Sequence, residues 1–228
     1  MPGKFDVKHF ILEGVHLAPF ATFAHLQPRH HAFLQSGYDH GHFLFSGPQI
    51  PPHGGFLAAR AESREVLDAL LAEEPFVKAG KMRFKRVVEF DPVQHQPLIK
   101  PWFAGAPVDA MAASTVAVGS GAGLTHFLLE GEHIVPFEQR APDLIAAHRA
   151  FLQAGYDRGD FLLSGPTIPP KGGVLVARAA SRAALDTMLA EEPYGKAGVM
   201  RCAAITAFHP VMHQVALRHW FGVEAKAA

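Results

Sequence analysis

The sequence contains little of several features that would define its class. Its 228 residues include one cysteine, Cys202, which excludes an intrachain disulfide framework and a four-cysteine zinc module. Charged residues make up only 18%, and 21 Lys plus Arg balance 21 Asp plus Glu. Nucleic acids and anionic membranes usually recruit a basic excess, so we expect neither as a partner.

Two further absences concern membranes and export. No run of about 20 apolar residues is present to span a bilayer. The first residues, MPGKFDVKH, lack the apolar centre of a signal peptide. We therefore expect a reduced, cytoplasmic setting.

Patterns that bind cofactors are also missing. Gly54-Gly55 follows Pro-Pro-His and introduces a strand, so it is neither a phosphate loop nor a dinucleotide fingerprint. His209 and His213 have the spacing of a helical zinc site, but Pro210 lies between them. In the first half of the chain, which has a similar sequence, Asp91 stands at the position of His209. We predict no cofactor and no metal.

What the sequence does contain is a tandem duplication. Residues 30–103 and 148–221 are identical at 44 of 74 aligned positions, and shorter matches precede them at a shift of 117 residues. Each copy is too long for a solenoid repeat and is therefore expected to be a small domain. We predict a first domain over 1–103, a linker rich in Ala, Gly and Ser over 104–123, and a second domain over 124–228.

Within each copy, the hydrophobic periodicity predicts a strand, a helix, two strands, a second helix and a last strand. Ser63 and Ser181 are typical N-caps of the second helix, and Gly155 is where a left-handed cap would end the first helix of the second copy. This order is the ferredoxin-like βαββαβ pattern, an α+β fold. Each copy ends in a tail with Trp-Phe, which we expect to pack against protein.

Several ordered motifs recur in both copies. The first copy contains a helix histidine, Gly-Tyr, Ser-Gly-Pro, Gly-Gly before a strand, an acidic residue before Pro-Phe, and Ala-Gly. This combination, over roughly 9–92 and 126–210, resembles the YciI-like (YCII-related) family. The resemblance implies ferredoxin-like domains that usually dimerise, here as an intrachain pseudo-dimer with an alpha-beta barrel arrangement, and an active centre made by a histidine and an acidic residue. The usual aspartate of that centre is glutamate in both copies.

The helix histidines are His30 and His148. Each lies on the apolar stripe of its predicted helix, three residues before a phenylalanine. One interpretation is a core histidine hydrogen-bonded to backbone. The other, which the resemblance favours, is a titratable group of an active site.

The acidic candidates are Glu74 and Glu192. The pattern places each at the C-terminus of the second helix, where a negative charge is unfavourable unless a cation answers it. That cation is either the lysine four residues on, Lys78 or Lys196, or the helix histidine of the same copy. The resemblance implies the second pairing.

Two serines complete the candidate site. Ser46 and Ser164 precede Gly-Pro at the end of a strand, where a hydroxyl could contact a ligand, although turn chemistry also explains them. Cys202 falls in a strand and is expected to be a buried, inert thiol.

Two functions fit these residues. One is a cofactor-independent enzyme of the lyase, isomerase or hydrolase type, in which the His/Glu pair of each copy acts as general acid-base on a small molecule. The other is a non-catalytic pseudo-dimer that binds a small ligand or serves a structural role. A further homo-oligomer of the chain is compatible with both.

Overall fold

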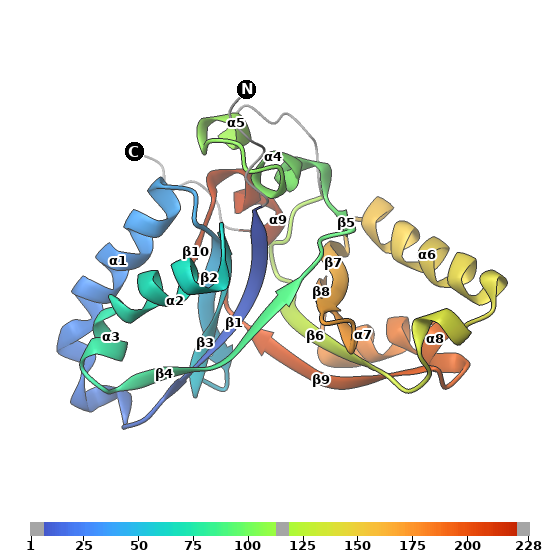
Figure 1. Ribbon diagram of the computed structural model, residues 1–228, viewed down its shortest axis with the longest axis horizontal. Helices are drawn as coiled ribbons and strands as arrows, with labels where there is room; N and C mark the ends of the chain where they lie inside the picture. The colour runs from blue at the N-terminus through green and yellow to red at the C-terminus, as the bar shows by residue number, and fades with distance from the viewer. Residues whose placement is uncertain (1–6, 113–118, 223–228) are drawn as a thin grey trace. The chain divides into compact units, whose positions relative to one another are not determined.

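The computed structural model describes residues 7–112 and 119–222, which fall into two compact units (Figure 1). The described part of the first unit consists of residues 7–89, 98–112 and 209–217. That of the second consists of residues 90–97, 119–208 and 218–222. Each unit therefore contains most of one copy of the repeat and a short segment from the other copy. The domain limits predicted at 103 and 124 stay a prediction.

The first unit is an antiparallel sheet with helices. Its strand order is β10-β2-β3-β1-β4, with antiparallel pairing of β1 to β3, β2 to β3 and β10 to β2. The elements are β1 (Lys8–His16), α1 (Gln27–Asp39), β2 (Phe43–Ile50), β3 (Gly54–Ala61), α2 (Arg64–Ala72), α3 (Pro75–Lys78), β4 (Met82–Phe90), α4 (Lys100–Phe103), α5 (Asp109–Ala112) and β10 (Met212–His213).

The second unit repeats this arrangement, with strand order β5-β7-β8-β6-β9 and antiparallel pairing throughout. Its elements are β6 (Thr125–His133), α6 (Pro142–Asp157), β7 (Phe161–Ile168), β8 (Gly172–Ala179), α7 (Arg182–Leu189), α8 (Pro193–Lys196), β9 (Met200–Phe208), β5 (Gln94–His95) and α9 (Arg218–Phe221). The prediction of a mixed α/β fold with two repeated halves is confirmed.

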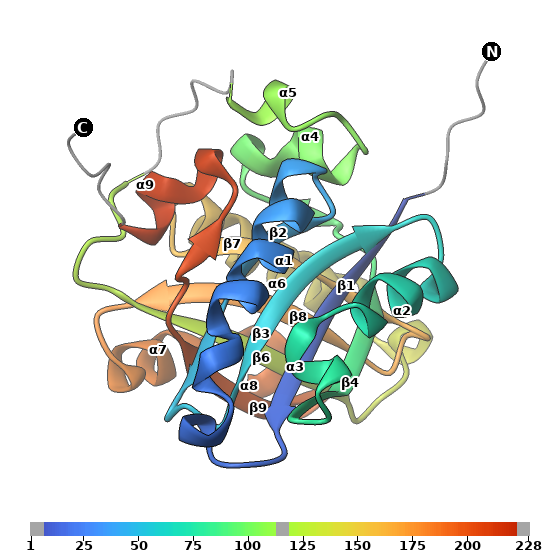
Figure 2. The ribbon, with the colours of Figure 1, turned by 90° about the vertical axis from the view of Figure 1, so that its left-hand side faces the viewer.

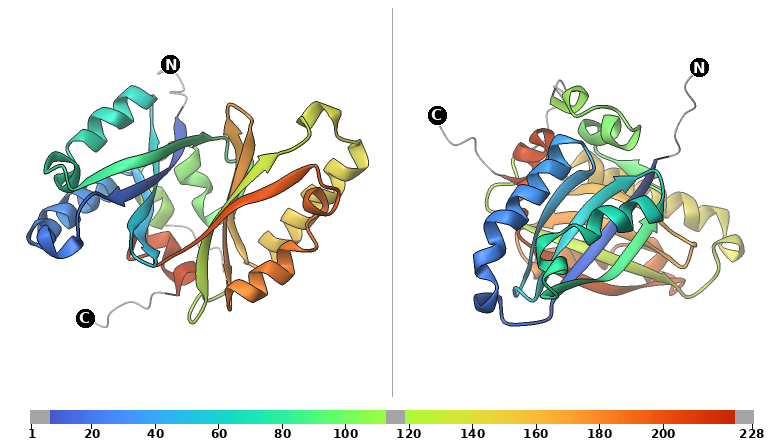
Figure 3. Two further views of the ribbon diagram at one scale, coloured as in Figure 1. Left: turned by 90° about the horizontal axis from the view of Figure 1, so that it is seen from below. Right: turned by 60° about the vertical axis from the view of Figure 1, so that its left-hand side comes forward.

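In each unit the two longer helices cover one face of the sheet, as Figure 2 shows for α1 and α2 and Figure 3 for α6 and α7. This face holds the core, because alternate residues of the strands are apolar there and meet the apolar stripes of the helices. Phe10, Leu34 and Leu67 belong to one continuous cluster in the first unit. The predicted caps are confirmed, since Ser63 accepts from Val66 N at 3.3 Å and Ser181 from Ala184 N at 3.1 Å.

The role predicted for Gly155 as a helix cap is wrong. Gly155 lies inside α6 and is buried, and a Cβ atom built there would lie 2.1 Å from the ring of Phe161. Gly37 meets Phe43 in the same way. The positive φ that ends the helix region belongs instead to Gly159, at 80°. Gly155 is therefore required for close packing between helix and strand.

The tails pack against protein, as predicted. Trp102 and Trp220 are buried, and their Nε1 atoms donate to the carbonyls of Gly41 at 2.9 Å and Gly159 at 3.0 Å. The strand that precedes each tryptophan is held in the other unit. In the first unit, buried Gln214 donates from Nε2 to two main-chain carbonyls, Tyr38 O and Phe43 O.

The predicted linker, 104–123, is only partly covered, because residues 113–118 lie outside the described residues. In its described part, α5 forms and Met111 is buried. The prediction that Cys202 is buried is wrong, because this residue is exposed on β9. Neighbouring atoms shield its thiol in part from water, and this raises the pKa of the thiol. In the part of the chain that the structure describes, no helix is both long and apolar enough to cross a membrane.

Candidate active site

The structure brings His30 and Glu74 together. His30 projects from α1, and its Nδ1 atom lies 2.7 Å from Oε1 of Glu74. The carboxylate is buried, with 1% of its side chain exposed, whereas 21% of the imidazole remains exposed. The ring of Phe76 stacks on the imidazole at 4.3 Å between centroids and 12° between planes. The histidine is thus fixed by a hydrogen bond and by an aromatic face.

The prediction that Glu74 lies at the C-terminus of the second helix is wrong. The helix α2 ends at Ala72, and Glu74 is instead the N-cap of α3, where Oε2 accepts from Val77 N at 2.8 Å. A negative charge is favourable at this position. The alternative lysine partner is also wrong, because Lys78 pairs with Glu73.

The second half repeats the geometry. His148 Nδ1 lies 2.7 Å from Oε1 of Glu192, and the imidazole stacks on Tyr194 at 3.8 Å and 7°. Glu192 caps α8 by accepting from Tyr194 N at 2.9 Å and Gly195 N at 2.7 Å. Lys196 pairs with Glu191 at 2.6 Å rather than with Glu192.

The environment of Glu192 favours its ionised form. Burial acts to raise the pKa of this carboxyl group, but hydrogen bonds from His148, Tyr194 N and Gly195 N outweigh it, so that the pKa lies below its usual value. An ionised carboxylate can only accept, so Nδ1 of His148 donates. The proton that the imidazole exchanges is then the one on Nε2.

Sequence reasoning missed the aromatic support of the two histidines and what lies behind it. Phe23 meets the ring of Phe76 at 5.0 Å in the first half. In the second half Arg140 occupies the equivalent position, with its guanidinium carbon 4.3 Å from the centre of Tyr194. The repeat aligns Phe23 with Arg140, so the sequence alone shows that the two copies differ at this position. Only the fold shows that either residue lies at the site.

A second histidine accompanies each pair. His16 ends β1, and its ring meets Phe23 at 5.2 Å. Burial, followed by the charges of His30 and His53, lowers the pKa of His16. At the equivalent end of β6, burial and the charge of Arg140 lower the pKa of His133. Both histidines are therefore neutral at pH 7.

The predicted serines have a different environment. Ser46 is buried on β2, and its Oγ shares a hydrogen bond of 2.8 Å with Tyr38 Oη. Ser164 does the same with Tyr156 at 2.7 Å. These contacts join the first helix of each half to its sheet. Binding of substrate by either serine stays a prediction.

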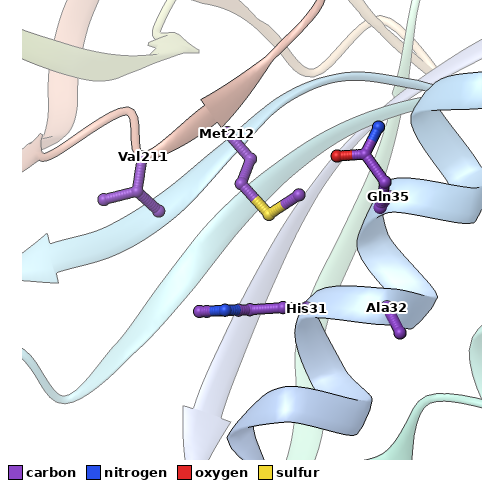
Figure 4. A pocket seen from close by; sticks show the side chains of 5 residues that line it. All are labelled: His31, Ala32, Gln35, Val211 and Met212. Atoms are coloured by element: carbon purple, nitrogen blue, oxygen red, sulfur yellow. The ribbon is translucent and has the colours of Figure 1, made fainter. Parts of the chain in front are cut away.

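A hollow of about 460 Å³ lies between α1 and the C-terminal segment of the first unit (Figure 4). The side chains of His31, Gln35 and Met212 point towards it. The rings of His30 and His31 are 5.8 Å apart, and His31, not His30, lines the hollow. Within residues 7–112 and 119–222, no three His, Cys, Asp or Glu side chains are grouped so as to hold a metal ion.

The model of the YCII-related domain family matches the chain twice, at residues 15–91 and 127–209. The chain therefore belongs to this family and carries its domain in duplicate. No curated protein matches the sequence.

Several solved structures share the fold. A mutant chlorite dismutase from Candidatus Nitrospira defluvii in complex with cyanide is 8% identical, with a TM-score of 0.61 and 95% of each chain covered. A heme-binding protein from Thermus thermophilus is 13% identical, with a TM-score of 0.55 and coverage of 94% of this chain and 95% of that one. A putative monooxygenase from Lactobacillus acidophilus NCFM is 11% identical, with a TM-score of 0.53 and coverage of 89% and 93%. At these identities the similarity concerns the fold alone.

Proposed function

We propose that the chain is a cofactor-independent enzyme acting on a small molecule, with His30–Glu74 and His148–Glu192 as two general acid-base pairs. The observation that carries this proposal is the 2.7 Å contact between imidazole and carboxylate, repeated in both halves. In each half the carboxylate is largely buried while about a fifth of the imidazole is exposed. Each imidazole therefore keeps an edge open to solvent, which a small molecule can reach.

The arrangement supports proton transfer at Nε2. The carboxylate accepts from Nδ1 and so fixes the tautomer, and the stacked aromatic ring fixes the plane of the imidazole. Nε2 is then the atom that takes a proton from a substrate, or returns one. Reactions that need such a group include elimination, isomerisation and hydrolysis.

We further propose that each half is a ferredoxin-like domain. The element order and the strand order β2-β3-β1-β4 support this, as does the similarity to the solved structures. The pairing of the halves as a pseudo-dimer with an alpha-beta barrel arrangement stays a prediction. So do the cytoplasmic location and any further homo-oligomer.

The experiment that tests the proposal follows proton abstraction directly. The chain is incubated in D₂O with a panel of small enolisable aldehydes, ketones and carboxylic acids, and incorporation of deuterium is followed by proton NMR. Exchange above the uncatalysed rate is expected for at least one compound. In the double variant His30→Gln/His148→Gln it should fall by about 10²- to 10⁴-fold, because glutamine retains hydrogen bonding without titrating near neutral pH.

A matched control is His40→Gln, which removes an exposed imidazole at the C-cap of α1, ten residues after His30. Equal exchange in the wild-type chain and the double variant would exclude the acid-base role. It would leave the alternative, a non-catalytic protein that binds a small ligand, for which native mass spectrometry of the purified chain should then detect a bound compound.

A further inference from the structure

The two sites differ in charge at one buried position. Phe23 of the first half is fully buried against Phe76, and Arg140 of the second half is buried against Tyr194. Both contact the aromatic ring that supports the histidine. A guanidinium therefore replaces an apolar ring at the same place in the fold.

Arg140 lies behind the ring that supports His148. The His148 ring is nearly parallel to Tyr194 with centroids 3.8 Å apart, so it occupies one face of Tyr194. The guanidinium carbon is 4.3 Å from the same ring centre and must occupy the other face. Both groups thus belong to one stack.

The polar contacts of Arg140 leave one nitrogen unpaired. Its Nε and Nη2 atoms donate to Val135 O at 3.3 and 2.9 Å, and Nη2 also approaches Val199 O at 3.5 Å. Nη1 is buried and has no hydrogen-bond partner within the described part of the chain. None of the carboxylates described there forms an ion pair with this guanidinium. A buried cation whose partners are two carbonyls and a ring face lacks the anion that would offset its desolvation.

A second cation lies near the same pair. On the first helix of each half, the residue after the histidine is His31 in the first copy and Arg149 in the second. Arg149 is exposed. The charge of Arg140 also contributes, after burial, to the lowered pKa of His133, which places that histidine within its electrostatic reach.

We propose that the site of the second half binds an organic carboxylate through Arg140, whereas the site of the first half, with Phe23 at that position, takes an uncharged ligand. The location of the ligand rests on the proposed function. Nη1 is closed to solvent, so a neighbouring side chain moves when the carboxylate binds. Phe137, which is 41% exposed with its ring 5.8 Å from the guanidinium carbon, is the side chain placed to do so.

The test compares benzoate with its neutral analogue benzamide. Each is titrated into the full chain with ¹³C-labelled histidine, and ring signals are assigned with His30→Gln and His148→Gln. Benzoate should shift the His148 signals and leave those of His30 in place, and benzamide should bind the second half at least about 10-fold more weakly. Equal binding of the two compounds, or equal shifts of both histidines, would overturn the proposal.

Variants test the role of Arg140 itself. Arg140→Phe installs the residue that the first half tolerates and should weaken benzoate binding by about 10- to 100-fold. Arg140→Lys keeps the positive charge but lacks the planar guanidinium, so it should give an intermediate loss of benzoate affinity. This variant tests the proposal even if Arg140→Phe does not fold. Arg182→Gln removes a positive charge from the surface of α7 and should leave binding unchanged. Wild-type affinity in both Arg140 variants, or an equal loss in Arg182→Gln, would contradict the assignment.

These outcomes are separate from those of the deuterium experiment. Benzoate binding is measured without turnover, so it can succeed when no exchange occurs. Addition of sodium phosphate distinguishes a carboxylate site from a general anion site. Displacement of benzoate by an equal concentration of phosphate would overturn the proposed specificity.

Discussion

The carboxylate of Glu74 joins His30 to the backbone of α3, because Oε1 contacts the imidazole while Oε2 accepts from Val77 N. One side chain therefore caps a helical turn and orients the histidine. The same turn carries Phe76, which stacks on the imidazole. The cap, the hydrogen bond and the aromatic support all come from one short segment, so the position of His30 depends on the integrity of that segment.

Replacement of Glu192 should change how stability depends on pH. At pH 7 Glu192→Gln is expected to lower the free energy of unfolding by about 1 to 3 kcal/mol, because charge-assisted hydrogen bonds are lost. The folded-state pKa of Glu192 is depressed, so its contribution is present above the unfolded pKa of roughly 4.3 and is lost as pH falls through the folded value. Urea unfolding from pH 7 to pH 3 should show the two curves converging on the acid side.

The control for that series is Glu191→Gln, which removes the neighbouring exposed carboxylate that pairs with Lys196. Exposed pairs of this kind contribute about 0 to 1 kcal/mol. A difference between wild type and Glu192→Gln that stays constant over the whole pH range would contradict the depressed pKa.

The single variants His30→Gln and His148→Gln should separate the two sites. Both histidines lie partly exposed beside a buried carboxylate, and glutamine retains a donor of similar size. The melting temperature is therefore expected to change little. The rate of deuterium exchange should fall by the share that the mutated half contributes to it. If one single variant abolishes all exchange and the other leaves it intact, only one half is active.

Gly155→Ala should destabilise the chain although alanine is the better helix former. The new Cβ atom would overlap the Phe161 ring, and overpacking of this kind costs about 1 to 3 kcal/mol. Urea unfolding measures the loss, and Phe161→Leu in the same chain should restore part of it. Gly198→Ala is the contrasting case: its Cβ would meet nothing within 4 Å, but its φ of +66° is unfavourable for alanine.

Removal of the second tail should lower the melting temperature. Trp220 is fully buried, and its Nε1 donates to Gly159 O. The centre of its ring lies 4.9 Å from the guanidinium carbon of Arg178. Trp220→Ala is expected to cost about 3 to 5 kcal/mol, and deletion of residues 218–228 at least as much. Val215→Ala, at a side chain that is 60% exposed, is the control. An unchanged melting curve in Trp220→Ala would show that this packing contributes nothing.

The repeat and the element order could be predicted from the sequence because both are local properties. The periodicity predicted the order of strands and helices, and Ser63 was identified as a cap from its position before an apolar stripe. The roles of Glu74 and Gly155 could not be predicted this way. A short helix after Pro75 changes the electrostatics of Glu74, and the need for glycine at 155 comes from a ring brought there by the fold.

The exchange of short strands between the copies was likewise not predictable. The strands β5 and β10 have only two residues each, which is too short for a periodic signal. Their partners, β7 and β2, are distant in sequence. The contact between His30 and Glu74 belongs to the same class, because 44 residues separate them and only the resemblance to a family suggested that they meet.

This strand exchange has a consequence for a chain cut between α5 and β6. The amino-terminal piece would carry β5, which pairs with β7 of the other piece, and the carboxy-terminal piece would carry β10, which pairs with β2. Each piece completes the sheet of its neighbour, so hydrolysis of one peptide bond does not set them free. Such a nicked protein should elute as one species from a sizing column and resolve into two bands only after denaturation.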